Sequence, residues 1–253
     1  MEERLQNILA HAGVASRRAA AALVESGVVT VDGLVVREPG ARFEAERAEI
    51  RVNGRPLATA TAKRTVVLYK PVGVLSTMSD PFGGKTVADV VYGSRRADSN
   101  TRQEGRVPSE RLVPVGRLDK DSEGLLLMSN DGDLVNRLTH PRFEHRKTYL
   151  VKVAGRWSAE KLALLRSPIK MDDGYVIRPV PVDVVEDLGH NVRILKFVLK
   201  EGRKRQIRKM CSAAHLVVLT LKRVAVGNFE LPRELRPGEW RDLTSDEIQA
   251  LFR

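Results

Sequence analysis

The stretch Val115-Gly116-Arg117-Leu118-Asp119-Lys120-Asp121-Ser122-Glu123-Gly124-Leu125-Leu126-Leu127 places a cluster of charged residues directly before an apolar segment that is predicted to be a buried strand. Charged groups in such a position cost free energy unless they have partners or a function. For a single Asp in an arbitrary chain, the usual interpretation is a turn in which the acids are solvated or cap local N–H groups. The rest of the sequence favours a functional interpretation here.

Three further segments carry residues that a hydrophobic core does not need. Residues 70–77, KPVGVLST, end a predicted strand in a turn that contains Pro and Gly. Residues 147–151, KTYLV, open another predicted strand with Tyr149 on it. Residues 201–210, EGRKRQIRKM, place five cations on about one and a half turns of a predicted helix.

Residues 1–58 are predicted to form a small module of two helices followed by hairpins. Apolar residues recur at helical spacing over residues 5–12, and a second helix is predicted at residues 17–26. The dipeptides Asp32-Gly33 and Asn53-Gly54 lie between apolar runs, and each is a hairpin signal.

Residues 59–64 are small and polar and are predicted to link this module to a larger domain at residues 65–253. In the larger domain, strands and helices do not alternate regularly, and adjoining strand candidates indicate antiparallel pairing. We therefore predict an α+β fold around a mostly antiparallel, mixed sheet. The predicted strands are 66–69, 125–129, 148–153, 192–199 and 217–226, and the predicted helices are 133–139, 159–166 and 203–214. Thr244 and Glu247 form a capping box for a last helix, and residues 93–111 are predicted to be a mobile basic loop.

The composition favours a polyanionic partner. The 253 residues include 43 Lys and Arg against 32 Asp and Glu, which gives a net charge of +11. Such a balance favours RNA or DNA as the partner. No run approaches the ~18 to 20 apolar residues that span a bilayer, and the start MEERLQ lacks the basic segment of a secretory signal. We therefore expect a cytoplasmic protein with no membrane contact. The single Cys211 excludes an internal disulfide and a zinc site built from cysteines.

The four charged or turn-forming segments, taken in their order along the chain, resemble those of the RNA pseudouridine synthases of the RsuA/RluB/RluE/RluF family, which act on ribosomal RNA. The resemblance extends from Thr65 to about Leu243, where residues 237–244, PGEWRDLT, look like the ending that these enzymes share. Residues 4–52 are similar to the S4 RNA-binding module that most of them carry. A single GRLD string is a weak signal, but four segments in the same order, preceded by an S4-like module, are specific to this family.

This resemblance implies an activity and a fold. The activity is isomerisation of a uridine in RNA to pseudouridine, in which the N1–C1′ bond breaks and a C5–C1′ bond forms. The fold is an α+β catalytic domain around a long, mostly antiparallel sheet, with the active cleft across its middle. Asp119 matches the family's catalytic aspartate, and no metal or cofactor is expected. Attack of Asp119 on C1′, attack on C6 and proton removal at C2′ remain open alternatives.

Three more residues match positions of the family's active site. Arg208 matches the basic partner of the aspartate, and a fixed guanidinium beside a carboxylate lowers the pKa of the acid and keeps it oriented. Tyr149 matches the aromatic residue that stacks on the target base after the nucleotide is flipped out, a contact worth ~1 to 3 kcal/mol per base. Arg117 looks like the residue that enters the vacated space or grips the phosphate of the flipped nucleotide.

The other basic residues of these segments are expected to contact RNA phosphates. In the larger domain they are Lys70, Arg203, Lys204 and Arg205, and in the S4-like module they are Arg4, Arg17 and Arg18. We also expect the segment of Lys70 to support the cleft structurally. Residues 1–62 hold 8 basic and 8 acidic side chains, so we expect the S4-like module to add little to the affinity for RNA.

The expected partner is ribosomal RNA or a pre-ribosomal subunit, and the chain is expected to be a monomer. Residues 113–117, VPVGR, and 130–132, NDG, look more like the branch of the family that acts on large-subunit RNA than the small-subunit branch. A competing hypothesis is a non-catalytic ribosome-assembly factor that only holds RNA. Asp119 distinguishes the two, because a pure binding protein gains nothing from a carboxylate that repels phosphate. A DNA-binding regulator is poorly supported, since no recognition helix with a dimer pattern is present.

Overall fold

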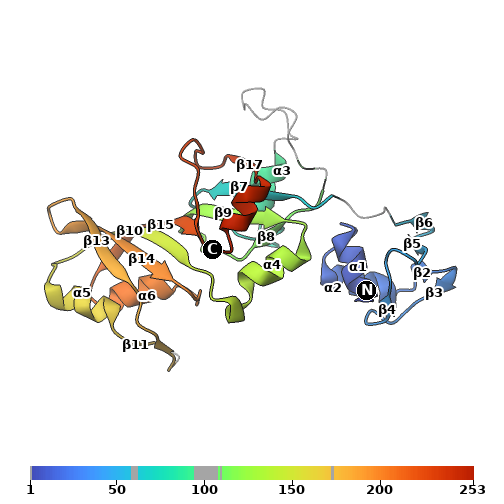
Figure 1. Cartoon of the computed structure of the whole chain (residues 1–253), viewed down its shortest axis with the longest axis horizontal. Coiled ribbons are helices and arrows are strands. Elements are labelled where there is room, and N and C mark those ends of the chain that lie inside the picture. Colours follow the sequence, from blue (N-terminus) through green and yellow to red (C-terminus); the bar gives the residue numbers. More distant parts are fainter. Residues whose placement is uncertain (1, 58–61, 94–107, 109, 172–173) are drawn as a thin grey trace. The chain divides into compact units, whose positions relative to one another are not determined.

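The computed structural model describes residues 2–57, 62–93, 108, 110–171 and 174–253. The chain divides into two compact units, and Figure 1 labels most of their elements. The smaller unit comprises residues 1–64, 108–112 and 129–132, and the larger unit comprises residues 65–107, 113–128 and 133–253. Residues 59–61 of the predicted linker and most of the predicted basic loop lie outside the described residues.

The smaller unit packs two helices against short antiparallel strands. Its elements are β1 (Glu3–Arg4), α1 (Leu5–His11), α2 (Arg17–Glu25), β2 (Val29–Val31), β3 (Leu34–Val35), β4 (Arg42–Phe43), β5 (Ile50–Val52) and β6 (Arg55–Pro56). Strands β3-β2-β5-β6 form one antiparallel sheet. Asp32 and Gly33 have φ angles of 49° and 81°, as a two-residue hairpin turn requires. The predicted helices and hairpins of this unit are therefore confirmed.

The core of the smaller unit lies between its helices and its sheet. Leu5 and Leu9 on α1, Val24 on α2 and Val29 on β2 are completely buried and pack in one cluster. The apolar spacing in the sequence thus produces a module with its own hydrophobic core, which stabilises it by about 1.5 to 3 kcal/mol per fully buried aliphatic side chain.

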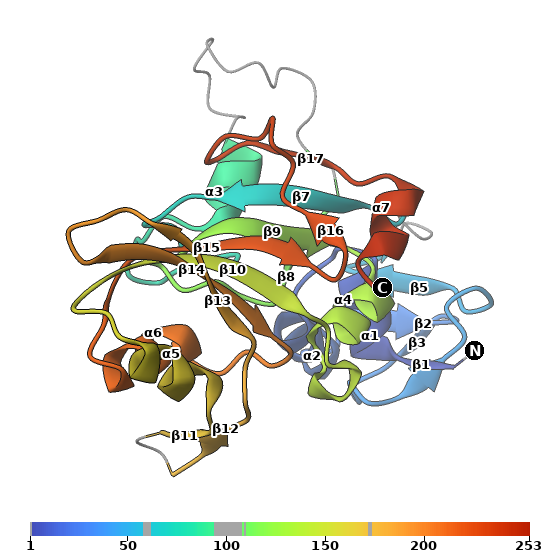
Figure 2. The same cartoon turned by 60° about the vertical axis from the view of Figure 1, so that its left-hand side comes forward.

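The larger unit is built on one long sheet, whose strands lie side by side in Figure 2. The strands of the unit are β7 (Thr65–Lys70), β8 (Val113–Val115), β9 (Glu123–Ser129), β10 (Lys147–Ala154), β11 (Ile169–Lys170), β12 (Val176–Ile177), β13 (Val182–Asp187), β14 (Val192–Leu199), β15 (Val217–Val226), β16 (Phe229–Glu230) and β17 (Trp240–Asp242). Of these, β11 and β12 pair only with each other, outside the long sheet. The sheet has the order β13-β14-β10-β15-β9-β7-β17, with β16 paired to β15 and β8 paired to β9. The pair β15–β9 is parallel, whereas β13–β14, β14–β10, β10–β15 and β7–β17 are antiparallel. The predicted α+β fold with a mostly antiparallel, mixed sheet is confirmed.

Helices cover this sheet at both ends. They are α3 (Val87–Tyr92), α4 (Gly132–Thr139), the short η2 (Pro141–Phe143), α5 (Ala159–Arg166), α6 (Gln206–Ala213) and α7 (Ser245–Ala250). Helix α6 contacts β15, and α5 contacts β13. Leu134 and Leu138 on α4 pack with Leu125 and Leu127 of β9 in one buried cluster. Among the described residues, no helix is long and apolar enough to cross a membrane.

The strand and helix predictions for this unit are mostly confirmed. The segments predicted at 192–199 and 217–226 coincide with β14 and β15, and the capping box predicted for the last helix is present at the start of α7. Helix α3, strand β13 and the short strands β8, β11, β12, β16 and β17 were not predicted. A capping box of Thr86 and Asp89 opens α3, so the sequence did contain a signal for that helix.

The predicted basic helix begins only at Gln206, later than expected. Arg205 has φ 54° and ψ 31°, a left-handed conformation that a continuous helix does not contain. The Gln206 side chain accepts a hydrogen bond from the backbone N–H of Arg203 at 3.1 Å and so fixes the turn before the helix. The prediction that all five cations share one helix was therefore wrong, because only Arg208 and Lys209 lie on α6.

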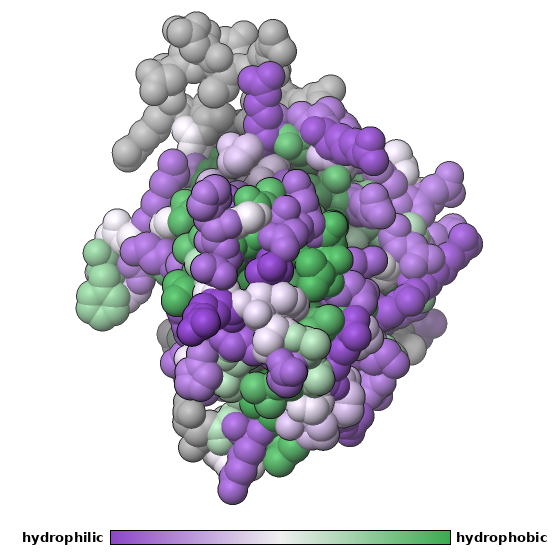
Figure 3. All heavy atoms as spheres, turned by 90° about the vertical axis from the view of Figure 1, so that its left-hand side faces the viewer, coloured by the Kyte–Doolittle hydropathy of each residue, from purple (hydrophilic) through white to green (hydrophobic). Residues whose placement is uncertain are grey.

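Strand β13 forms one edge of the long sheet. Val184 and Val185 are exposed on this strand, and Asp183, Glu186 and Asp187 lie next to them. Figure 3 shows a face of the molecule on which hydrophobic side chains are scattered among hydrophilic ones. Charged side chains along an edge strand oppose pairing with the edge of another sheet.

Candidate active site

The charged turn before β9 is held by the segment that follows β7. Ser76 Oγ accepts a hydrogen bond from Leu118 N at 3.0 Å and donates one to Leu118 O at 2.8 Å. Gly73 N donates to Lys120 O at 2.7 Å. These bonds fix the main chain on both sides of Asp119, so the Asp119 carboxylate starts from a defined backbone position.

Lys70 supports the same turn from inside the protein. Its side chain is completely buried, and its Nζ donates to Ser122 O at 2.7 Å and to Pro71 O at 3.0 Å. Burial lowers the pKa of Lys70 to about 8, although the carboxylates of Asp119 and Asp121 act in the opposite direction. Because Lys70 has no exposed surface, it offers an RNA phosphate no contact in this structure, and its bonds are those of a structural support.

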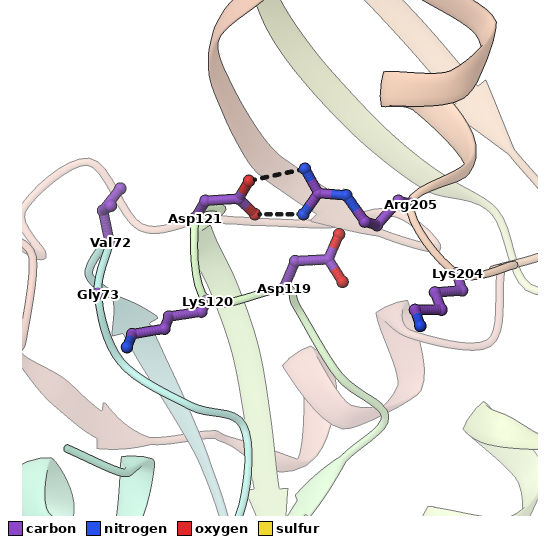
Figure 4. A pocket seen from close by; sticks show the side chains of 7 residues that line it. All are labelled: Val72, Gly73, Asp119, Lys120, Asp121, Lys204 and Arg205. Carbon is purple, nitrogen blue, oxygen red and sulfur yellow. Dashed lines mark hydrogen bonds and ion pairs between the residues drawn. The ribbon is translucent and has the colours of Figure 1, made fainter. Parts of the chain in front are cut away.

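A pocket of about 440 Å³ opens beside the turn. It is lined by Val72, Gly73, Asp119, Lys120, Asp121, Lys204 and Arg205. The Asp119 side chain is half-buried. In Figure 4 it extends toward the side of the pocket formed by Lys204 and Arg205, whereas Lys120 extends in the opposite direction. The pocket thus combines two carboxylates with three cations, an arrangement suited to a polar ligand that carries negative charge.

Asp121 forms the ion pairs of this pocket. Its carboxylate binds Arg205 in a two-pronged contact, with Nη1–Oδ1 at 3.1 Å and Nη2–Oδ2 at 3.0 Å. Arg208 Nε lies 3.3 Å from Asp121 Oδ2, and Arg208 Nη2 donates to the main-chain oxygen of Asp121 at 2.7 Å. Partial burial favours the neutral acid, but the hydrogen bond from Arg205 and the charge of Arg208 outweigh it. The pKa of the Asp121 carboxyl therefore lies below its ordinary value.

Asp119 differs from Asp121 in this respect. Within the described part of the chain, no hydrogen bond or ion pair engages the Asp119 carboxylate. The structure brings Arg208 to the turn of Asp119, but Arg208 contacts Asp121 directly. The role of Arg208 as the basic partner of Asp119 remains a prediction.

Tyr149 lies on the sheet beside the turn rather than in the lining of the pocket. On β10 it is paired with Phe197 of β14 on one side and with Arg223 of β15 on the other. Arg223 is in turn paired with Gly124 of β9, which follows the turn that carries Asp119. A single row of paired residues on three strands, β10, β15 and β9, therefore leads from Tyr149 to the end of that turn. The Tyr149 side chain is only 7% exposed.

Two cations in this part of the sheet, the buried Arg223 and the half-buried Lys147, were missed by sequence analysis. Arg223 is 3% exposed, and its Nε donates to Leu125 O at 2.7 Å. Burial lowers the pKa of Lys147 to about 8, and the charge of Arg223 adds to this effect. Lys147 and Tyr149 share a face of β10, since they are two residues apart on a strand. The signal for Arg223 was the pair Lys222-Arg223 inside an otherwise apolar run.

The basic residues predicted to bind RNA have different surroundings. Lys204 lines the pocket with Arg205. The guanidinium carbon of Arg203 lies 3.1 Å from the centroid of the Tyr175 ring, whose hydroxyl donates to Glu201 at 2.9 Å. Arg203 is therefore held against an aromatic ring instead of extending freely toward a ligand.

Other predicted contacts lie outside the pocket lining. Arg117 is exposed, and the buried Leu118 separates it from the half-buried side chain of Asp119, as expected for extended backbone. Arg17 and Arg18 are the exposed first residues of α2, and Arg4 is exposed on β1. These last three belong to the smaller unit. Among the residues that the structure describes, no group of three or more His, Cys, Asp or Glu side chains could hold a metal ion.

Two family models match the sequence. One, described as RNA pseudouridylate synthase, covers residues 64–213, and the other, described as S4 domain, covers residues 3–48. The first model contains the turn with Asp119, the strand with Tyr149 and all of α6.

Whole-chain comparisons give similar proteins. An uncharacterized RNA pseudouridine synthase of Aquifex aeolicus is 36% identical over 254 residues, which cover 100% of this chain and 95% of that protein. The ribosomal large subunit pseudouridine synthase B of Bacillus subtilis is 37% identical over 249 residues, which cover 98% of this chain and 95% of that protein. A crystal structure of pseudouridylate synthase matches with a TM-score of 0.65 at 25% identity, over 98% of this chain and 99% of that one.

Proposed function

Because the chain belongs to the RNA pseudouridylate synthase family, we propose that it converts a specific uridine of ribosomal RNA into pseudouridine with Asp119 as its catalytic carboxylate. The reaction is an isomerisation: the N1–C1′ bond breaks, a C5–C1′ bond forms, C5 loses a proton and N1 gains one. No atom is gained or lost overall. The protein must therefore hold the detached base, turn it and move a proton.

The observation that carries this proposal is the difference between the two acids of the pocket. Both oxygens of Asp121 are engaged by guanidinium groups. Asp119 lies on a backbone fixed by hydrogen bonds and lines the same pocket, and its carboxylate forms no hydrogen bond or ion pair with the described residues. Only Asp119 is thus available to a substrate atom, as a nucleophile at C1′ or C6 or as a base at C2′.

Tyr149 is the proposed stacking partner of the target base. A base in a folded RNA is stacked between its neighbours, so an enzyme that works on the glycosidic bond must flip the nucleotide out. The row of paired residues from Tyr149 to the end of the Asp119 turn supports a position beside the reacting carboxylate. Arg208, anchored to the main chain of Asp121, is the proposed source of positive charge near Asp119.

We propose large-subunit ribosomal RNA, free or in a pre-ribosomal subunit, as the substrate. The similarity to ribosomal large subunit pseudouridine synthase B of Bacillus subtilis and of Vibrio vulnificus supports this choice over small-subunit RNA. The S4 domain supplies a second RNA-binding element. We propose that the chain acts as a monomer in the cytoplasm, where ribosomal RNA is available to it.

The test is pseudouridine mapping on ribosomal RNA transcribed in vitro, which is unmodified at the start. Both large-subunit and small-subunit transcripts are incubated with the wild-type protein, with Asp119→Asn and with Asp246→Asn. Asp246 is an exposed acid on α7 and gives a matched charge control. We expect one modified uridine in the large-subunit transcript for the wild type and the control, and a rate lower by about a thousandfold or more for Asp119→Asn.

Two outcomes would contradict the proposal. Modification by Asp119→Asn at the wild-type rate would exclude Asp119 as the catalytic carboxylate. Modification confined to the small-subunit transcript would reject the proposed substrate. Equal melting temperatures of the three proteins serve as the check that Asp119→Asn is folded.

A further inference from the structure

We propose that Arg205 and Arg208 form a binding site for a phosphate group of the RNA backbone, and that the Asp121 carboxylate occupies this site until RNA displaces it. We call this site the phosphate seat. The inference rests on the proposed function in taking RNA as the ligand. It assigns Asp121 a role of its own, distinct from that of Asp119.

The geometry of the seat fits an oxyanion. Two guanidinium groups converge on one carboxylate, with Arg205 in a two-pronged contact at 3.1 and 3.0 Å and Arg208 Nε at 3.3 Å from the same Oδ2 atom. Arginine binds carboxylates and phosphates with the same pair of parallel N–H donors. The two oxygens of Asp121 therefore stand where two non-bridging phosphate oxygens can bind.

The seat persists when the carboxylate leaves. Arg208 Nη2 donates to the main-chain oxygen of Asp121 at 2.7 Å, and this bond does not depend on the side chain of Asp121. The Arg208 side chain is only 14% exposed, so it has little freedom to move. The backbone of Arg205 is fixed at the start of α6, directly before Gln206, whose side chain is buried. Both cations thus stay near the pocket in the absence of the carboxylate.

The carboxylate itself is easy to displace. The side chains of Asp121 and Arg205 are each 44% exposed, and ion pairs with that exposure contribute only about 0 to 1 kcal/mol. An RNA phosphate that replaces the carboxylate releases condensed counterions. This release makes the binding free energy of the phosphate more favourable, and Asp121 has no such contribution. Asp121 and Asp119 line the same pocket, so an RNA phosphate in the seat also displaces the second carboxylate of that pocket.

The test is RNA binding as a function of salt concentration. The proteins are wild type, Asp121→Asn, Arg205→Gln, the double variant Asp121→Asn/Arg205→Gln, and Asp119→Asn. The probe is the large-subunit transcript, and isomerisation leaves every phosphate in place, so turnover does not change the ligand's charge. Asp119→Asn is the matched control, because it removes one negative charge from the same pocket without freeing a guanidinium. Asp121→Ser is a second variant that also lacks the carboxylate.

We expect Asp121→Asn and Asp121→Ser to bind RNA about three- to tenfold more tightly than wild type at low salt. The slope of log affinity against log salt should stay that of wild type, because the same phosphate fills the seat in both proteins. In Arg205→Gln the slope should become shallower by about 0.7 to 0.9, which corresponds to the loss of one phosphate contact. In the Arg205→Gln background, replacing Asp121 should change neither quantity, because the seat has lost one of its two cations. Asp119→Asn should leave the slope unchanged.

Equal effects of Asp119→Asn and Asp121→Asn would overturn the inference, since they would show a general charge effect. Weaker binding by both Asp121 variants would also overturn it and would make the ion pairs purely structural. These results are separable from the proposed function. If wild type forms no pseudouridine but the predicted salt slopes are found, the catalytic proposal fails and the phosphate seat stands.

Discussion

Gly124 on β9 lies directly opposite Arg223 on β15, and the two backbones approach so closely that a Cβ atom on Gly124 would overlap the carbonyl oxygen of Arg223. Gly124 also has φ +106°, in the region that L side chains rarely adopt. The charged turn with Asp119 ends just before this contact. The absence of a side chain at Gly124 therefore sets how closely the turn is held to the centre of the sheet.

We predict that Gly124→Ala lowers the free energy of unfolding by about 3 kcal/mol or more, because it combines an unfavourable φ with a clash against the main chain. Gly238→Ala is the matched control: Gly238 has φ +93°, but nothing lies within 4 Å of its ideal Cβ position. In the control, only the unfavourable φ angle should lower the free energy of unfolding, by about 1 kcal/mol. Denaturant unfolding measures the free energy of unfolding of both variants. An equal decrease in the two would show that the close approach to Arg223 does not affect stability.

The proposed role of Tyr149 predicts that removing its hydroxyl lowers the reaction rate without weakening RNA binding. Tyr149→Phe keeps the ring and its packing between the neighbouring strands, so stability and RNA affinity should stay close to wild type. If the hydroxyl takes part in moving the proton from C5, the rate under single-turnover conditions should fall about a hundredfold or more. Tyr149→Ala should also weaken RNA binding, by loss of a stacking contact worth about 1 to 3 kcal/mol. An unchanged rate for Tyr149→Phe would rule out a part for the hydroxyl in the chemistry.

The buried Lys70 predicts a pH dependence of stability. Its pKa is about 8 in the folded protein, against 10.5 for an ordinary lysine. Between these two values the unfolded chain binds more protons than the folded one, so this group makes stability rise with pH from about 8 to about 10.5. The gain is at most about 3 kcal/mol, and it is absent below pH 8 because Lys70 is then charged in both states.

The measurement is the difference in unfolding free energy between wild type and Lys70→Met across that pH range. Subtracting the variant removes the contribution of other titrating groups, including Lys147, whose pKa is also lowered to about 8. We expect the difference to grow in favour of wild type as the pH rises from 8 to 10.5. A difference that is constant with pH would mean that Lys70 titrates alike in the folded and unfolded chains.

The sequence predicted the elements whose signals are local. The apolar runs at 192–199 and 217–226 became β14 and β15, because a strand buried on one face needs such a run whatever its neighbours are. The start of α6 could not be predicted in this way. It depends on the left-handed conformation of Arg205 and on the Gln206 side chain, and neither has a signal in the helical pattern.

The candidate site shows the same limit. Asp119 was predicted as the catalytic carboxylate from the resemblance of its motif, and the structure places it in the lining of a pocket. Sequence analysis predicted Arg208 as the partner of Asp119, whereas in the structure Arg205 and Arg208 both pair with Asp121. Nothing in the spacing of Asp119 and Asp121 tells which carboxylate meets a guanidinium. That choice depends on how the turn and α6 face each other across the pocket, which is a property of the folded chain.

The smaller unit allows a test of the expectation that its contribution to RNA affinity is small. Arg17 and Arg18 are exposed at the start of α2, where a helix N-terminus favours anions. If each contacts one phosphate, Arg17→Gln/Arg18→Gln should reduce the slope of log affinity against log salt by about 1.4 to 1.8. Arg47→Gln/Arg51→Gln is the control, because these two arginines are already paired with Glu44 and Glu49. The single-turnover rate at saturating protein should be equal in both double variants, since neither changes the pocket of Asp119. If the Arg17 and Arg18 substitutions change the slope no more than the control does, the RNA is held by the larger unit alone.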